Sequence, residues 1–230
     1  LTEGRPTRLG AFLIALVLVV IIFGDVIFNR GTLSMLDMAN ITWKNRTYGF
    51  YHPERPLMAV HYGYSDTGGA AFQSEPMIQF MKYSIEKRQS PYWNPYSATG
   101  AVGPETLVDN KFSPFTLLVA VLGGSNTAFH FVLLTLYVFA IYFIIRVVTA
   151  QFNLSLLSGI TAAVIYLLNG FSVANISSNV AQSYLYFPFL LFTLCSLVLK
   201  PNFWRFLAAI LANILLLMTT FLPTTTLVML

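Results

Sequence analysis

Charged residues are scarce in this chain of 230 residues. Lys, Arg, Asp and Glu make up 10% of it, against about 25% in ordinary soluble domains. Hydrophobic residues make up 56%, and the mean hydropathy is +0.68. The formal net charge of +4 is spread along the chain rather than gathered in a basic patch, which argues against nucleic acid as a partner. The composition is that of an integral membrane protein whose first partner is the lipid bilayer.

Cysteine is almost absent as well. The single residue, Cys195, lies in an apolar stretch, so an internal disulfide and a cysteine-based metal site are both excluded. We expect its thiol to be buried and structural. No set of His, Asp and Glu residues has the spacing of a strong metal motif, and the sequence therefore predicts no dedicated metal site.

Long apolar runs are the main feature that is present. A bilayer core about 30 Å thick is crossed by roughly 20 apolar residues in a helix. The third and fourth runs are short and would stand nearly upright or in a locally thinned bilayer. The first is too long for a signal-peptide core and has no clear cleavage site, so we interpret it as a retained span. The five predicted spans are residues 9–28, 126–148, 156–173, 183–199 and 203–222.

Basic residues in short loops predict the orientation, because they stay preferentially on the cytoplasmic side. Arg5 and Arg8 precede the first span, and Arg146 ends the second. Lys200 and Arg205 separate the fourth span from the fifth. All of them fall on one side if the N-terminus is cytoplasmic.

Three parts follow from this orientation. Residues 1–28 form a cytoplasmic N-terminus and the first transmembrane helix, residues 29–125 form a large exterior loop, and residues 126–230 hold four further spans. The chain begins at Leu1 and stops at Leu230 in a hydrophobic run, so we expect it to be truncated at the C-terminus. The expected fold class is an all-α membrane protein, a polytopic helical bundle.

The exterior loop contains a first short helix in "PMIQFMKYSIEKR". Ser74 can cap its start, and Pro76 is tolerated in the first turn. The pattern predicts an amphipathic helix on the membrane surface. Its apolar positions recur at helical spacing: Met77, Ile78, Met81 and Ile85.

A second short helix is expected in "SPFTLLVAVLGG". Ser113 is its cap, Pro114 takes the first helical position, and Gly123 is the stop. The segment is far too short to cross a bilayer. We interpret it as a re-entrant or interfacial half-helix.

The stretch PYWNPYSATG lies between these two helices. Pro91 and Pro95 stiffen it and keep the preceding residues out of helix. Trp93 and Tyr96 have apolar rings with polar tips that suit the headgroup layer. The stretch is expected to hold the amphipathic helix and the half-helix together at the membrane surface.

The order of these motifs resembles the YfhO family of bacterial polytopic membrane proteins. The resemblance runs roughly from Asp66 to Leu199, through Gln73, Pro76, the Trp-Asn-Pro-Tyr motif at 93–96, "FSPFTLLVAVLGGSNTAFHF" and "SGITAAVIYLLNGFSVANISSNVAQSYLYFPF". That family usually has a glycine shortly before Pro-x-Trp, where this chain has residues 88–90, Arg-Gln-Ser. The YfhO family is in turn similar to the GT-C fold of membrane glycosyltransferases, in which a large exterior first loop carries juxtamembrane helices.

The resemblance implies transfer of a sugar from a polyprenyl-phosphate donor to an exterior acceptor. Such a reaction needs a carboxylate that takes the acceptor proton or holds a divalent cation. The family order places this catalytic carboxylate at Asp66, and Asp37 is the alternative because many GT-C acids lie closer to the first span. Asp25 lies near the outer end of the first span, where we expect an interfacial or helix-paired role.

The resemblance also implies where the substrate binds. Lys82 and Arg88 are candidates for the donor phosphate, although cations on an interfacial helix also meet lipid headgroups. His61 is a candidate for the acceptor or a cation, and His130 indicates a cavity or a helix-packing hydrogen bond. The remaining substrate-binding candidates are Gln73, Trp93, Asn94 and Tyr96.

Two other functions stay open. One is a non-catalytic structural subunit that keeps the fold and binds other membrane subunits. The other is a transporter, which is disfavoured because the last four spans show few charges and no paired broken helices. The resemblance favours the bacterial inner membrane as the location.

Overall fold

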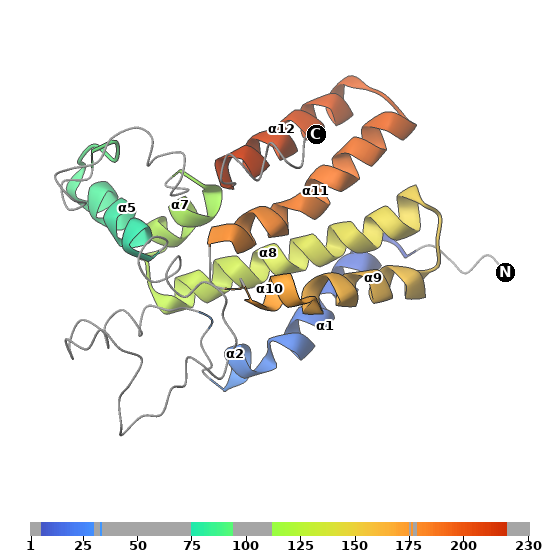
Figure 1. Cartoon of the computed structure of the whole chain (residues 1–230), viewed down its shortest axis with the longest axis horizontal. Coiled ribbons are helices and arrows are strands. Elements are labelled where there is room, and N and C mark those ends of the chain that lie inside the picture. The colour runs from blue at the N-terminus through green and yellow to red at the C-terminus, as the bar shows by residue number, and fades with distance from the viewer. Residues whose placement is uncertain are drawn as a thin grey trace.

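The computed structural model describes residues 6–29, 33, 75–93, 112–174, 176 and 179–219. These residues form nine α-helices and one π-helix and no strand (Figure 1). The all-α prediction is therefore confirmed for the described part of the chain. The helices are α1 (Arg8–Ile22), α2 (Gly24–Phe28), α5 (Glu75–Lys87), α7 (Pro114–Val121), α8 (Asn126–Arg146), the π-helix η2 (Val147–Gln151), α9 (Leu156–Leu168), α10 (Gly170–Ala174), α11 (Asn179–Leu199) and α12 (Phe203–Thr219).

Helix α8 is the centre of the bundle. It packs against α1, α9 and α11, and α11 packs in turn against α12. The side chains of Leu133, Tyr137, Ile141 and Ile145 on α8 are all at most 1% exposed. Figure 1 shows α5 and α7 at the end of the bundle where α8 begins, away from the chain's N-terminus. The other helices therefore pack around the buried residues of α8.

Two helices are long and apolar enough to cross a membrane. They cover Asn126–Gln151, which is α8 with η2, and Gln182–Leu199, which is most of α11. The helices α1, α9 and α12 are apolar but shorter. Each of the five predicted spans therefore coincides with apolar helix, and two of them meet the length expected of a full crossing.

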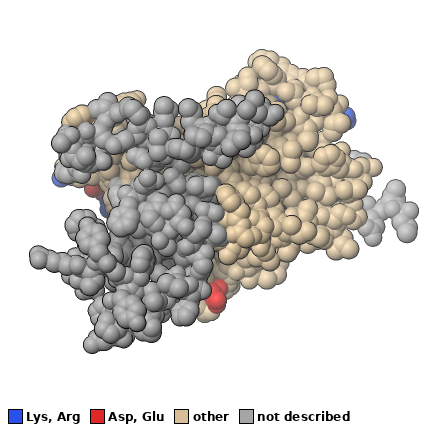
Figure 2. All heavy atoms as spheres, in the orientation of Figure 1, with Lys and Arg blue, Asp and Glu red and all other residues tan. Residues whose placement is uncertain are grey.

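Small residues face inward on the outer helices, and large ones face outward. On α1, Ala11 and Ala15 are 0% exposed, whereas Leu9 is 67% and Ile21 70% exposed. Helix α12 repeats the pattern, since Ala212 is fully buried and most of its large apolar side chains are exposed. Soluble proteins bury their large aliphatic residues instead. Figure 2 shows the result as a bundle surface with almost no Lys, Arg, Asp or Glu along its middle.

Two of the predicted spans are interrupted rather than continuous. The first span breaks at Phe23, between α1 and α2, next to the poor helix former Gly24. The third span breaks at Asn169, between α9 and α10. The Asn169 side-chain oxygen accepts a hydrogen bond from the Ser172 backbone N–H at 3.0 Å and so begins α10. A side chain that competes with the backbone ends one helix and caps the next.

The π-helix η2 widens the last turn of α8. The Phe152 N–H bonds the Val147 carbonyl at 3.1 Å, a five-residue step. Helix α9 packs closely here, because a methyl group built on Gly159 would lie 3.1 Å from Thr149 Cγ2. The π turn and the glycine together set the path of the chain from α8 into α9.

Helix α5 forms where the sequence predicted an amphipathic helix, but its apolar face is covered by protein. Met77, Phe80 and Met81 pack with Ala120 of α7 in one cluster. The expectation that this face rests on the membrane surface is therefore corrected for these residues: α7 buries them. Ile85, the last position of the predicted apolar face, is 45% exposed.

Candidate functional site

Helix α7 begins and ends at the residues that the sequence predicted. Ser113 Oγ accepts a hydrogen bond from the Thr116 N–H at 3.1 Å, and Pro114 follows in the first turn. At the other end the N–H groups of Gly123 and Gly124 bond the Ala120 and Val119 carbonyls. Both glycines have positive φ, 95° and 61°, which glycine adopts without steric cost.

A hydrogen bond locks α5 to the end of α7. Gln79 Nε2 donates to the Gly124 carbonyl at 2.9 Å. A methyl group built on Gly124 would lie 3.2 Å from Lys82 Cδ. A side chain at position 124 would be strained by the positive φ and would have to shift the Lys82 side chain of α5. This contact places the Lys82 stem against the turn between α7 and α8.

Helix α7 is also tied to α11 by a buried polar pair. Ser113 Oγ donates to Gln182 Oε1 at 2.9 Å, and the two residues are 0% and 4% exposed. Ser113 thus caps its own helix and binds a second one. Since a buried polar group without a partner is costly, the pair fixes how α7 sits on the first turns of α11.

Two tyrosines join α9 and α11 by reciprocal hydrogen bonds. The rings of Tyr166 and Tyr184 stack with centroids 4.1 Å apart and planes 6° apart. The Tyr184 hydroxyl donates to the Tyr166 carbonyl at 2.7 Å, and the Tyr166 hydroxyl donates to the Tyr184 carbonyl. Asn169 Nδ2 donates to the Tyr184 hydroxyl at 2.5 Å. We call these three residues the tyrosine pair and its asparagine.

Helix breaks explain why both carbonyls are available. Pro188 lies inside α11 four residues after Tyr184, and it has no N–H to give to the Tyr184 carbonyl. Helix α9 ends at Leu168, so the Tyr166 carbonyl also lies beyond the regular hydrogen-bond ladder. Side-chain hydroxyls replace the missing backbone donors, as membrane helices commonly require.

Among the described residues of the last four spans, one helix is broken, at Asn169 between α9 and α10, whereas α11 continues through Pro188 from Asn179 to Leu199. The break at Asn169 and the proline of α11 face each other through the tyrosine pair. In transporters such breaks leave carbonyls open to coordinate ions. Here both carbonyls accept protein hydroxyls instead. The two hydroxyls therefore join α9 to α11 at this point.

Two further polar residues of this region have protein partners. His130 Nε2 accepts the Leu33 N–H at 2.9 Å, a hydrogen bond to a residue outside the helices rather than the helix-packing bond that the sequence suggested. Asp25 Oδ1 accepts from Asn29 Nδ2 at 2.9 Å, and Asn29 is the C-cap residue of α2. The partner of Asp25 among the described residues is therefore local, four residues further along the chain.

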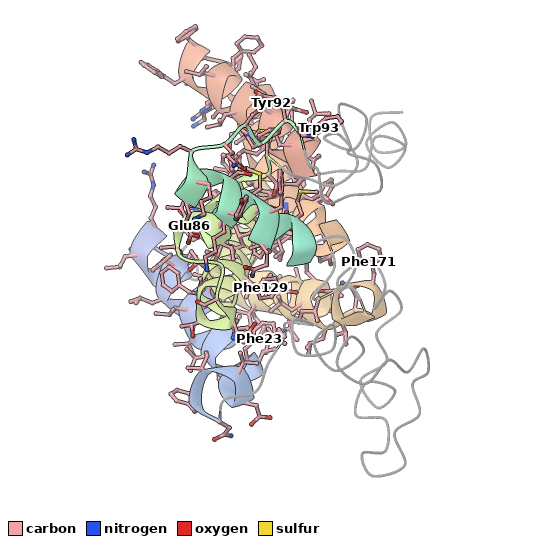
Figure 3. All side chains as sticks on the ribbon, turned by 90° about the vertical axis from the view of Figure 1, so that its left-hand side faces the viewer. Phe23, Glu86, Tyr92, Trp93, Phe129 and Phe171 are labelled. Carbon is pink, nitrogen blue, oxygen red and sulfur yellow. The ribbon has the colours of Figure 1, made fainter. Side chains whose placement is uncertain are left out.

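Three predicted substrate-binding residues lie in the described part of this end. Lys82 is half-buried, and its Nζ lies 3.9 Å from Glu86 Oε1 on the same helix. Arg88 is exposed and ends α5 with φ 54°, in the left-handed region that favours glycine. Trp93 is 49% exposed. Figure 3 shows Tyr92 and Trp93 on the coil after α5, on the side of this end away from Phe23.

Within the stretch that follows α5, Tyr92 is the described residue whose ring contacts the start of α7. Its ring lies 5.3 Å from that of Phe112, just before α7. The sequence assigned this role to Trp93 and Tyr96. Tyr96 lies outside the described residues, as do the other site candidates: Asp37, His61, Asp66, Gln73 and Asn94.

The other end of the bundle holds the basic residues that predicted the orientation. Of the five, Arg8, Arg146, Lys200 and Arg205 line a single cavity of about 570 Å³; the fifth lies outside the described residues. We call this end the basic end, and the end with α5 and α7 the opposite end. Near the basic end on α11, Cys195 is half-buried rather than buried.

Sequence reasoning missed the Ser113–Gln182 pair and the tyrosine pair. A signal for the second was present, because a proline four residues after a tyrosine frees that tyrosine's carbonyl. The partner on another helix gave no such signal. No family model, curated protein or solved structure matches this chain.

Proposed function

We propose that this chain is an integral membrane protein with the basic end in the cytoplasm. The inside-out distribution of side chains supports this, because membrane helices pack through small residues and turn large apolar ones to lipid. Ala11 and Ala15 on α1 are buried while the leucines beside them are exposed. The four cations at one end agree with the cytoplasmic preference of Lys and Arg.

Within this setting we propose a GT-C-like glycosyltransferase of a bacterial inner membrane. The observation that carries the proposal is the pair α5 and α7, two short helices packed on each other at the end away from the cations. The YfhO-like motif order implies such juxtamembrane helices in an exterior loop.

The proposed reaction moves a sugar from a polyprenyl phosphate to an acceptor hydroxyl. The bond between the sugar's anomeric carbon and the phosphate oxygen breaks, and a bond to the acceptor oxygen forms. The acceptor proton passes to the carboxylate of Asp66, or of Asp37 in the alternative. The polyprenyl phosphate leaves with the electron pair. Lys82 and Arg88 are the proposed partners of its charge.

The second candidate is a non-catalytic subunit that keeps the fold to bind other membrane subunits. The pairing of polar groups at the opposite end favours it. Ser113 with Gln182 and Tyr166 with Tyr184 satisfy each other inside the protein, which is typical of a rigid framework. A framework of this kind also serves an enzyme, so the two candidates are separated by experiment.

The test is sugar transfer in membranes that carry the full-length gene, with a labelled polyprenyl-phosphate-sugar donor. Wild type is compared with Asp66→Asn and Asp37→Asn at matched expression. We expect one of the two substitutions to lower transfer at least about 100-fold, since general acid–base catalysis contributes about 10²–10⁴-fold. Asp25→Asn is the control, because it makes the same change at a residue that bonds Asn29 at the end of its own helix.

Loss of transfer in one of the first two variants alone supports the enzyme and identifies its carboxylate. Transfer that is absent from wild type, or unaffected by both substitutions, overturns the enzyme proposal. The structural-subunit candidate then predicts that membrane partners copurify with the protein and remain bound to both variants.

A further inference from the structure

The cavity at the basic end is built from four segments. Arg146, Ala150 and Gln151 come from the end of α8 and from η2, and Ser196 and Lys200 come from the end of α11 with the residue after it. The start of α1 and the start of α12 complete the lining. The π turn brings residues five apart onto one side of the helix. Arg146 and Gln151 thereby line the same cavity.

Hydrogen bonds join the segments that line the cavity. Gln151 Nε2 donates to Ser196 Oγ at 2.6 Å and joins η2 to α11. Arg205 Nη1 donates to the carbonyls of Lys200 at 2.6 Å and Ser196 at 3.2 Å. These bonds hold the turn between α11 and α12. The cavity is therefore formed by a preorganised part of the fold.

The charge in the cavity is all of one sign. The described residues that line it include Arg8, Arg146, Lys200 and Arg205 and no carboxylate. The acidic residues in the described part of the chain belong to α2 and α5, at the opposite end. Four like charges around one space repel each other. An anion in the cavity would remove that repulsion.

Among the described residues, three buried side-chain polar atoms lack a hydrogen-bond partner, on Ser84, Asn126 and Arg146, and of these residues only Arg146 lines the cavity. The Arg146 Nε is buried and has no hydrogen-bond partner among the described residues. Buried polar groups are normally paired, and an exception calls for an explanation such as an absent ligand. A guanidinium offers a planar fork of donors that matches two oxygens of a phosphate.

The other part of the lining is apolar. Phe192, Leu199, Trp204 and Ala208 share the cavity with the cations, and Trp204 is 74% exposed. Trp is enriched where apolar and polar parts of a membrane meet. A ligand for this space therefore has an anionic head and an apolar body.

We propose that this cavity binds the phosphate headgroup of an anionic membrane lipid. The phosphate oxygens accept hydrogen bonds from Arg146 and lie among the other three cations. The acyl chains run along Phe192, Leu199 and Trp204 toward the bilayer. The inference relies on the membrane location proposed above and is independent of the glycosyltransferase reaction at the opposite end.

The test measures lipid retained by the purified full-length protein, taken from nanodiscs of mixed phosphatidylglycerol and phosphatidylcholine. Native mass spectrometry counts each lipid on the released protein. We expect phosphatidylglycerol to be retained selectively, and Arg146→Gln to lower its affinity at least about tenfold. Lys200→Gln changes an exposed residue, so it tests the same cavity if Arg146→Gln folds poorly.

Lys87→Gln is the matched control, because it removes one exposed charge from α5 at the opposite end. Selective retention that is lost in the cavity variants and kept in this control supports the proposal. Equal retention of both lipids, or an equal decrease in all variants, overturns it. Displacement of the lipid by inorganic phosphate at matched concentration would overturn the lipid as the source and identify a soluble phosphate site.

Discussion

The two ends of this bundle differ in the charge that their polar side chains carry. At the opposite end, Ser113 bonds Gln182 and the tyrosine pair bonds across α9 and α11, so side chains satisfy one another. At the basic end, four cations line a cavity, and none of the described residues in its lining is a carboxylate. At the opposite end, neutral polar side chains bond helices to one another. At the basic end, positively charged side chains line a cavity that can hold a ligand.

This difference tells which substitutions damage the fold and which damage binding. Removing a buried, paired group leaves its partner unsatisfied at a cost of about 1–3 kcal/mol. Removing one of several like charges around an open cavity relieves repulsion instead. The opposite end should therefore be sensitive in stability measurements, and the basic end in ligand measurements.

The largest effect on stability is expected for Ser113→Ala. The change removes the cap of α7 and leaves Gln182 Oε1 without this donor in a buried site. We expect the free energy of unfolding to fall by about 2–3 kcal/mol, measured by reversible unfolding in mixed micelles. Ser125→Ala is the control, since Ser125 caps α8 but is exposed; it should lose about 1 kcal/mol.

Equal losses for the two serine variants would contradict the role of the bond to Gln182. Both serines accept a backbone N–H in the same way, so the difference between them reports the other two contacts of Ser113 Oγ, with Gln182 Oε1 and with Thr116 Oγ1, each at 2.9 Å.

A smaller effect is expected for Tyr166→Phe, which removes the hydroxyl that satisfies the Tyr184 carbonyl. The loss should be about 1 kcal/mol. Pro188→Ala restores a backbone N–H four residues after Tyr184, so Tyr166→Phe should cost less in that background. A double-mutant cycle measured by unfolding in micelles gives this coupling. Identical costs in both backgrounds would show that the proline does not create the need for the hydroxyl.

The smallest effect, with the opposite sign, is expected for Lys200→Gln at the basic end. In zwitterionic detergent without anionic lipid, the free energy of unfolding should rise by up to about 0.5 kcal/mol because one of four like charges is removed. The gain should vanish near 1 M salt, where screening acts over about 3 Å. A clear loss of stability would mean that Lys200 has a partner in the folded protein and would end the contrast between the two ends.

Local patterns were enough to predict much of the fold. The helical class, the two short helices and the cap and stop of α7 all depend on residues that are close in the sequence. Ser113, Pro114 and Gly123 act through backbone geometry within one turn, which sequence reasoning can read. Asn169 and Pro188 also act within their own helices, because Asn169 ends α9 and Pro188 removes one backbone N–H from α11.

The sequence by itself determined where apolar helices form and that the basic residues between them share one end, because hydrophobicity and charge act through composition alone. Only the tertiary structure decided which faces meet: that α7 covers the apolar side of α5, that Tyr166 reaches Tyr184, and that Arg146, Lys200 and Arg205 surround one cavity. The physical reason is that these contacts join residues far apart in the chain, and their geometry depends on how every helix of the bundle packs at once.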